Sequence, residues 1–122
     1  MPRTAIPVTQ LANFDGIASA NEFKNNEVSA DVVNGNAFTW TGRESLICRN
    51  SGASARTITV SSVPVKGRSG DITTYNIPAG ESHTVPPLPA EGWMQADGMV
   101  YVDGSNAEVK FTLLRMPPNL PL

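Results

Sequence analysis

Residues 93–116, WMQADGMVYVDGSNAEVKFTLLRM, decide the fold expected for this chain. Two apolar runs, 99–102 and 109–116, flank the compact sequence Asp-Gly-Ser-Asn at 103–106. Glycine takes a positive φ freely, and Asp and Asn side chains bond their own backbone in turns. The pattern therefore predicts a β-hairpin.

The second run alternates with a period of two. One face takes Val109, Phe111 and Leu113, and the other takes Lys110, Thr112 and Leu114. This alternation is typical of a strand with one face in a core. If that face is buried, Phe111→Ala costs about 3–5 kcal/mol.

Further short runs read as strands. Residues 44–50 place Leu46 and Cys48 on one face, and residues 56–61 point Ile58 and Val60 inward. A short loop containing glycine separates these two runs, so we expect them to pair antiparallel.

Strands are also expected at 71–77, before Pro78-Ala79-Gly80, and at 81–85, before two prolines. Asn34-Gly35 is either a type I′ hairpin turn between 31–33 and 37–40 or a simple loop.

Both ends of the chain are rich in proline. Residues 1–12 predict an extended arm, which is either the first strand of the chain's own sheet or a segment that reaches onto a neighbouring subunit. The tail 117–122 carries Leu120 and Leu122 and no charged side chain. These leucines are expected either to lie in a groove of this subunit or the next one, or to be frayed.

The pattern as a whole predicts an all-β fold. Short strands with frequent turn signals and no convincing helix indicate a small antiparallel β-sandwich or a partly open β-barrel. The length favours a single domain, divided into the arm 1–12, a sandwich core 13–116 and the tail 117–122.

Composition excludes several functions. A formal net charge of −2 gives no electrostatic footprint for nucleic acid, and no apolar run is long enough to predict a membrane span. The N-terminus lacks the apolar region of a signal peptide, so synthesis in a cytoplasm is expected. The single Cys48 excludes an internal disulfide and fits a reducing compartment.

Catalytic and metal-binding groups are scarce. The only histidine, His83, reads as a surface strand residue, and Cys48 reads as a small buried hydrophobe. Asp71, Asp97 and Asp103 each adjoin a glycine, which favours turns over a metal site. No enzyme, cofactor or metal is therefore expected.

The four large amphipathic aromatics allow two readings: Trp40, Tyr75, Trp93 and Tyr101. Together on one concave face they would form a platform for sugar, whereas Trp93 and Tyr101 would otherwise pack the core or a subunit interface.

Several ordered segments carry a resemblance: 1–6, 67–71, 77–81, 95–103 and 111–117. Together they resemble small β-sandwich capsid decoration, or cement, proteins of tailed bacteriophages. The resemblance implies a structural protein on the outside of the expanded capsid, where it binds the major capsid protein and ties neighbouring capsomers together. It further implies assembly in the host cytoplasm and a homo-oligomer, with a trimer favoured. The Asn-rich segment 13–36 and the tail depart from the plainest members.

Candidate contact residues follow from this reading. They are the arm residues Arg3, Thr4, Ile6 and Val8, the tail residues Leu120 and Leu122, and a possible trimer core of Trp93, Tyr101 and Leu114. Deletion of residues 1–8 is predicted to leave the fold intact and to abolish capsid binding. The alternatives are a carbohydrate- or host-surface-binding module on the virion and a minor tail or connector component.

Overall fold

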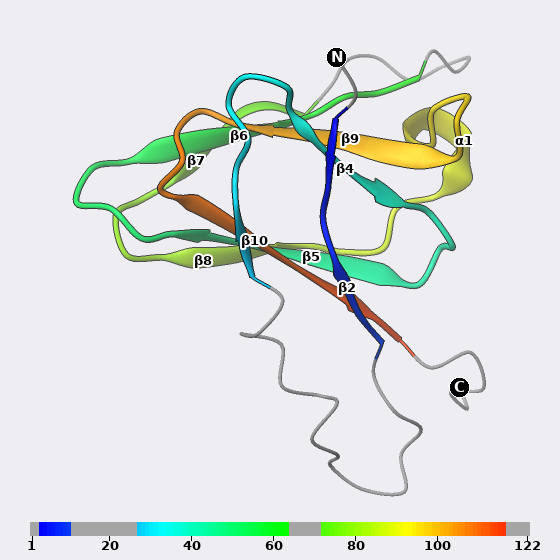
Figure 1. The fold of residues 1–122 in the computed structure, drawn as a ribbon, viewed down its shortest axis with the longest axis horizontal. Helices are drawn as coiled ribbons and strands as arrows, with labels where there is room; N and C mark the ends of the chain where they lie inside the picture. Colours follow the sequence, from blue (N-terminus) through cyan, green and yellow to red (C-terminus); the bar gives the residue numbers. More distant parts are fainter. Residues whose placement is uncertain (1–2, 11–26, 64–71, 117–122) are drawn as a thin grey trace, which may run out of the picture.

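Two stacked β-sheets form the chain in its computed structural model, which describes residues 3–10, 27–63 and 72–116 (Figure 1). The sheets are mixed and do not close into a barrel. The expectation of an all-β sandwich is therefore confirmed, and the alternative of a barrel is not.

Each sheet contains five strands among the described residues. The first sheet has the order β1 (Thr4–Ala5), β4 (Asn36–Thr39), β9 (Met99–Gly104), β6 (Arg56–Val60), β7 (Ile72–Ile77). The second has the order β2 (Val8–Gln10), β10 (Val109–Arg115), β5 (Glu44–Asn50), β8 (Ser82–Val85). The short β3 (Val28–Ser29) also pairs with β10, on the edge that β2 occupies.

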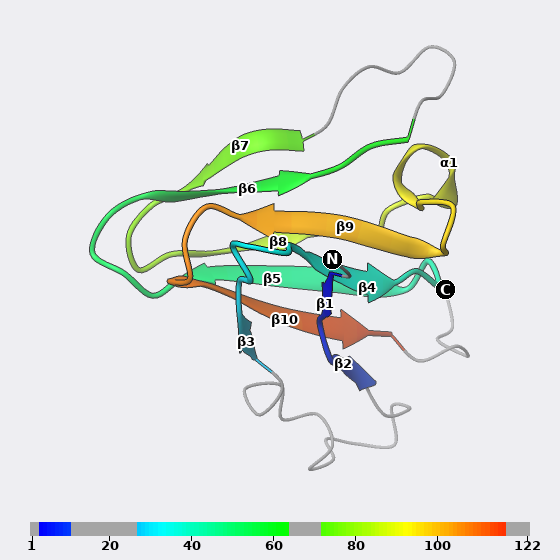
Figure 2. The same cartoon turned by 45° about the horizontal axis from the view of Figure 1, so that its top comes forward.

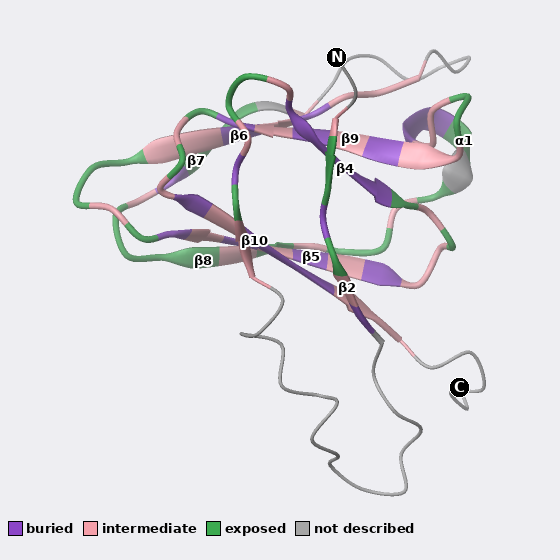
Figure 3. Cartoon of the chain, viewed as in Figure 1, coloured by how far each residue is buried: buried purple, intermediate pink, exposed green. Residues whose placement is uncertain are grey.

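The core lies between the two sheets. Its side chains come from alternate positions, as the period-two patterns predict: Leu46, Cys48, Ile58, Val60, Val100, Val102, Val109, Phe111 and Leu113 are all buried. Figure 3 shows the resulting buried stretches along β5, β9 and β10, while β1 and much of β8 are exposed. Burial of Cys48 confirms its reading as a small hydrophobe.

The hairpin predicted at 103–106 is wrong. β9 and β10 belong to different sheets, so the chain crosses the sandwich instead of reversing within one sheet. Gly104 ends β9, and a Cβ there would lie 2.6 Å from the Ala30 Cβ. The glycine is thus needed for close approach and not for a turn with positive φ.

One other pairing predicted from a turn signal is also wrong. β5 and β6 do not pair, because the loop between them crosses from one sheet to the other. Of the two interpretations of Asn34-Gly35, the simple loop is correct, because residues 31–33 form no strand and β3 and β4 lie in different sheets. The single helical turn, α1 (Ala90–Trp93), contains non-helical backbone at Glu91 and Gly92, in keeping with the absence of a convincing helix.

Residues 3–10 run as an extended strap across one side of the sandwich (Figure 2). β1 pairs in parallel with β4 of the first sheet, and β2 pairs in parallel with β10 of the second. Between them Ile6 is buried at 4% exposure. We call residues 3–10 the N-terminal strap. Its two parallel pairings make the sheets mixed, where antiparallel sheets were expected.

The N-terminal strap bears on two expectations, the interpretation of residues 1–12 and the effect of deleting residues 1–8. It lies on the chain's own sheets, as the first of the two interpretations of residues 1–12 holds. Deletion of residues 1–8 would remove Ile6 from the core, so an intact fold is no longer expected for that variant.

Candidate functional site

The surface around the start of the strap combines exposed backbone with exposed aliphatic side chains. β1 is the edge strand of its sheet, and both of its residues are exposed. Beside it, the turn before β4 projects Val32 at 55% exposure and Val33 at 89%. We call Thr4, Ala5, Val32 and Val33 the strap surface.

Local hydrogen bonds fix the turn that carries the two valines. The Asp31 carboxylate accepts hydrogen bonds from the backbone N–H groups of Val33, at 3.2 Å, and Asn34, at 3.0 Å. Gly35 has a φ of +78°, a conformation that few residues other than glycine adopt without strain. The valines are therefore held outward by a well-defined turn.

The turn is also tied to the strap. The Thr4 hydroxyl donates to Asp31 Oδ2 at 2.5 Å, and the Thr4 N–H donates to the Gly35 carbonyl at 3.0 Å. Asn36, which is buried, accepts from the Asp31 N–H and donates to the Thr4 carbonyl. The Thr4 hydroxyl is the largest influence lowering the pKa of Asp31. Strap and turn thus form one surface.

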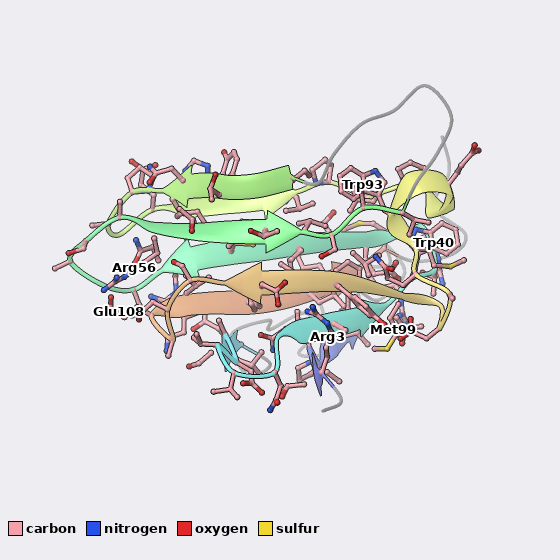
Figure 4. The ribbon with its side chains drawn as sticks, turned by 90° about the horizontal axis from the view of Figure 1, so that it is seen from above. Arg3, Trp40, Arg56, Trp93, Met99 and Glu108 are labelled. Carbon is pink, nitrogen blue, oxygen red and sulfur yellow. The ribbon has the colours of Figure 1, made fainter. Side chains whose placement is uncertain are left out.

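Arg3 anchors the N-terminal end of the strap on β9 (Figure 4). Its guanidinium donates to Asp103 Oδ1 at 2.8 Å and lies 4.4 Å from the centroid of the Tyr101 ring. Tyr101 in turn donates its hydroxyl to Asp97 Oδ2 at 2.6 Å. This hydrogen bond lowers the pKa of Asp97 and raises that of Tyr101. Asp103 therefore binds the strap through Arg3 and does not stabilise a turn.

The structure places the predicted contact residues in different environments. Arg3 and Thr4 lie at the strap surface or its edge, and Val8, Tyr101 and Leu114 are half-buried. Ile6 and Trp93 are buried in the chain's own core, so their side chains are not available to another subunit in this fold. Leu120 and Leu122 lie outside the described residues. The exposed Val32 and Val33 were missed, because two valines in sequence predict a strand and not the tip of a turn.

A pocket of about 150 Å³ opens on the opposite side of the sandwich, between β7 and β8. Apolar groups dominate its walls, which are formed by Ile58, Ile72, Tyr75, His83, Thr84, Val85 and Pro86. β7 and β8 end their respective sheets, so the pocket lies between two edge strands.

A chain of hydrogen bonds lies at this pocket. The Tyr75 hydroxyl is 2.7 Å from His83 Nδ1, and His83 Nε2 is 2.9 Å from Glu81 Oε1. Proximity of Tyr75 to His83 follows from the meeting of two edge strands in different sheets, which sequence spacing does not reveal.

Cys48 lies opposite His83 in the register of β5 and β8. A cysteine beside a histidine is the pairing that activates a thiolate nucleophile. Here, however, burial raises the pKa of the Cys48 thiol to about 12. The thiol therefore stays protonated at neutral pH, and the pair does not supply a nucleophile.

The four aromatics do not form one platform. Trp93 is buried, and the half-buried Trp40 donates its indole N–H to the Leu88 carbonyl at 2.6 Å. Tyr75 lies at the β7 edge of its sheet, while Tyr101 lies in β9 beneath Arg3. The concave sugar-binding face considered from the sequence is therefore not assembled.

The described ranges hold no cluster of three or more His, Cys, Asp or Glu side chains placed to bind a metal. Among these same residues, no helix has the length and apolar character needed to span a membrane. Comparison with known proteins finds no family model, no curated protein and no solved structure that matches the chain.

Proposed function

We propose that this protein is a non-enzymatic structural component of a bacteriophage virion. It binds the outside of the assembled capsid and stabilises the shell by bridging neighbouring copies of the major capsid protein. The sequence resemblance to capsid decoration proteins is the origin of this proposal. The strap surface is the structural observation that carries it.

Exposure of the two valines is the main support. Val32 and Val33 are adjacent in the chain and exposed, and hydrogen bonds tie their turn to Thr4 of the exposed strand β1. Apolar groups grouped in this way, unlike single exposed ones, are typical of binding surfaces.

The edge position of β1 adds a second mode of contact. An edge strand presents backbone N–H and C=O groups that an extended segment of a partner can join. A capsid subunit would thus add a strand beside β1 while its apolar side chains cover Val32 and Val33. A trimer of this protein would multiply such contacts through effective concentration.

Binding to the intact shell alone would be enough for the proposed role. A protein that binds the assembled capsid and not its separated subunits stabilises the assembled state by mass action. No catalytic group is needed for this effect.

A reconstitution experiment tests the proposal. Purified protein is added to expanded capsids that lack it, and bound protein is measured by co-sedimentation. The double variant Val32→Ser/Val33→Ser is expected to fold with unchanged stability, because both side chains are exposed, and to lose most of its capsid binding. The matched control is Ala53→Ser/Ala55→Ser, in the exposed loop between β5 and β6, which should bind as the parent does.

Copy number in virions supplies an independent test. Quantitative mass spectrometry of purified particles should find the chain in a fixed, near-stoichiometric ratio to the major capsid protein. A few copies per particle would instead assign the chain to the tail or the connector, and the decoration role would be abandoned.

A further inference from the structure

The two sides of the sandwich are closed differently. On one side the N-terminal strap joins both sheets and inserts Ile6 between them. On the other side, β7 and β8 each end their sheet, and neither pairs with a further strand among the described residues. The apolar pocket lies between these two edge strands. The strap thus gives an example, within this fold, of an extended segment that joins sheet edges and places one aliphatic side chain between the sheets.

A β-bulge in β7 shapes the pocket. Ile72 pairs with Val60 and Tyr75 pairs with Ile58, so three steps along β7 match two steps along β6. In a regular strand residues three apart point to opposite faces. The extra residue brings Ile72 and Tyr75 to the same face, where both line a space of about 150 Å³. An apolar cavity of this volume admits a benzene-sized group, so the pocket has room for one aliphatic side chain.

Hydrogen bonding to β5 shows which backbone groups of β8 face outward. The Asn50 N–H donates to the Glu81 carbonyl at 2.9 Å, and in an antiparallel pair the residues that bond across the ladder alternate along each strand. His83 therefore bonds to β5, whereas Ser82 and Thr84 direct their N–H and C=O groups to the edge that no described strand occupies. Backbone groups at such an edge bind an extended segment of another chain.

A carboxylate adjoins the pocket. Glu81 directly precedes β8, and its Oε1 lies 2.9 Å from Nε2 of His83, which lines the pocket. The Glu81 side chain is 56% exposed, and none of the described Lys or Arg side chains pairs with it. Residues two apart in a strand share a face. The complementary ligand therefore carries an aliphatic side chain and, two residues away on the same face, a positive charge.

We propose that this side of the sandwich binds an extended segment of a partner protein in which leucine or isoleucine is followed two residues later by arginine or lysine. The segment pairs antiparallel with β8, which is the slightly more stable direction of pairing. Its aliphatic residue lies opposite His83 and enters the pocket, and its basic residue lies opposite Glu81. The residue between them exchanges backbone hydrogen bonds with Ser82. The site is separate from the strap surface, so the proposal does not rest on capsid binding.

Methyl NMR of the full-length chain with a designed peptide tests the proposal. The probe is acetyl-Thr-Leu-Thr-Arg-Thr-amide, whose leucine and arginine have the required spacing. Its addition should shift the methyl resonances of Ile58, Ile72 and Val85 until they saturate. Those of Val32 and Val33 should stay in place. The peptide with asparagine in place of leucine should bind at least about tenfold more weakly. Pocket resonances that do not move at millimolar peptide would overturn the proposal.

N-methylated peptides test the strand pairing without altering the protein. A methyl group on the nitrogen of the central threonine blocks its hydrogen bond to Ser82 and should abolish the pocket shifts. The matched control carries the methyl group on the leucine nitrogen, which faces away from β8, and should bind as the parent peptide does. Equal binding of the two peptides would mean that the pocket takes a side chain without strand addition, and would overturn the proposed mode.

The variant Glu81→Gln tests recognition of the basic residue. It should weaken binding of the probe about two- to fivefold, as expected for an exposed ion pair. Glu91→Gln, which alters an exposed carboxylate outside the pocket lining, is the control. Equal affinities of the parent and Glu81→Gln would overturn this part of the proposal. Pocket shifts that vary with protein concentration in the absence of peptide would assign the site to a second copy of this chain and overturn binding of a different partner.

Discussion

Glu44 shows how a single buried carboxylate is kept charged. It accepts hydrogen bonds from the backbone N–H groups of Thr41, at 2.7 Å, and Gly42, at 3.2 Å, and from Arg115 Nε at 2.7 Å; the Thr41 hydroxyl also donates to it. Burial by itself raises the pKa of Glu44, but these bonds outweigh it and the net shift is downward. The carboxylate thus ties β5, the loop before it and β10 together.

This residue predicts a pH dependence of stability. Because the pKa of Glu44 is lower in the folded chain than its ordinary value of 4.5, its stabilisation is present above that value and is lost as the pH falls through the folded pKa. Glu44→Gln should cost about 1–3 kcal/mol at neutral pH and should flatten the loss of stability in acid. Urea unfolding from neutral to acidic pH measures both effects. The exposed Glu91→Gln serves as control, and parallel acid losses in the parent and Glu44→Gln would contradict the prediction.

Thr74 is the one described non-glycine residue with a positive φ, at +47°. For a β-branched side chain this conformation is a true outlier and costs about 1–3 kcal/mol. Thr74→Asn, which tolerates the left-handed region better, should therefore raise the free energy of unfolding by up to about 1 kcal/mol. Urea unfolding measures the change, and Thr84→Asn, on the exposed face of β8, is the control. A lower stability for Thr74→Asn would show that the threonine makes a compensating contact.

Among the elements, the N-terminal strap combines structural and functional roles. Its inward side chain Ile6 belongs to the core, while Thr4 and Ala5 are exposed, and Thr4 is hydrogen-bonded to the turn that carries Val32 and Val33. A substitution on one face should therefore leave the other property unchanged.

Ile6→Ala should destabilise the chain by about 2–5 kcal/mol, because it leaves a cavity between the sheets. The matched control is the exposed Ala5→Ser, which should change stability by less than about 0.5 kcal/mol. Thermal and urea unfolding compare the two variants. Equal stabilities would mean that the strap is not packed on its own sandwich in solution, and would favour an arm that reaches onto a neighbour.

Strands could be predicted from this sequence, but their partners could not. Alternation of Ile58 with Thr59, or of Phe111 with Lys110, is local and reports correctly which side chains face a core. Turn signals report only that the chain changes direction. Whether the next strand joins the same sheet or the opposite one depends on packing across the sandwich, such as the approach of Gly104 to Ala30.

The candidate sites were predictable only in part. Arg3 and Thr4 were identified from the terminal position and composition of the arm; Thr4 belongs to the strap surface, and Arg3 lies next to it on β9. The pocket escaped prediction for two reasons. It joins residues of β6, β7 and β8 from both sheets, and the bulge in β7 breaks the alternation that places Ile72 and Tyr75.

At the scale of the whole molecule, most connections cross between the sheets. Among the described elements, the connections that change sheet are β1 to β2, β3 to β4, β4 to β5, β5 to β6, β7 to β8, β8 to β9 and β9 to β10. A strand that follows such a crossing can pair only with a strand distant in the sequence. The entropy cost of closing the intervening loop is incurred before the stabilising contacts form, so pairing is slow.

This topology predicts slow folding for a chain of its size. Refolding from urea should have its main phase in the range of milliseconds to seconds, as for other all-β sandwiches. Stopped-flow fluorescence of the buried Trp93 and the half-buried Trp40 follows the reaction. A main phase completed within microseconds would indicate that local pairs form first and would contradict the crossing topology.

The parallel pairing of β2 with β10 gives the domain a particular response to tension. The two strands lie near opposite ends of the chain, and they point in the same direction. A pull on the ends therefore drags β2 and β10 past each other lengthwise, so that their ladder of hydrogen bonds is loaded all at once and not opened one bond at a time. Such shear loading makes the mechanical strength of this sandwich depend on direction: it resists traction along its ends far better than peeling at β8.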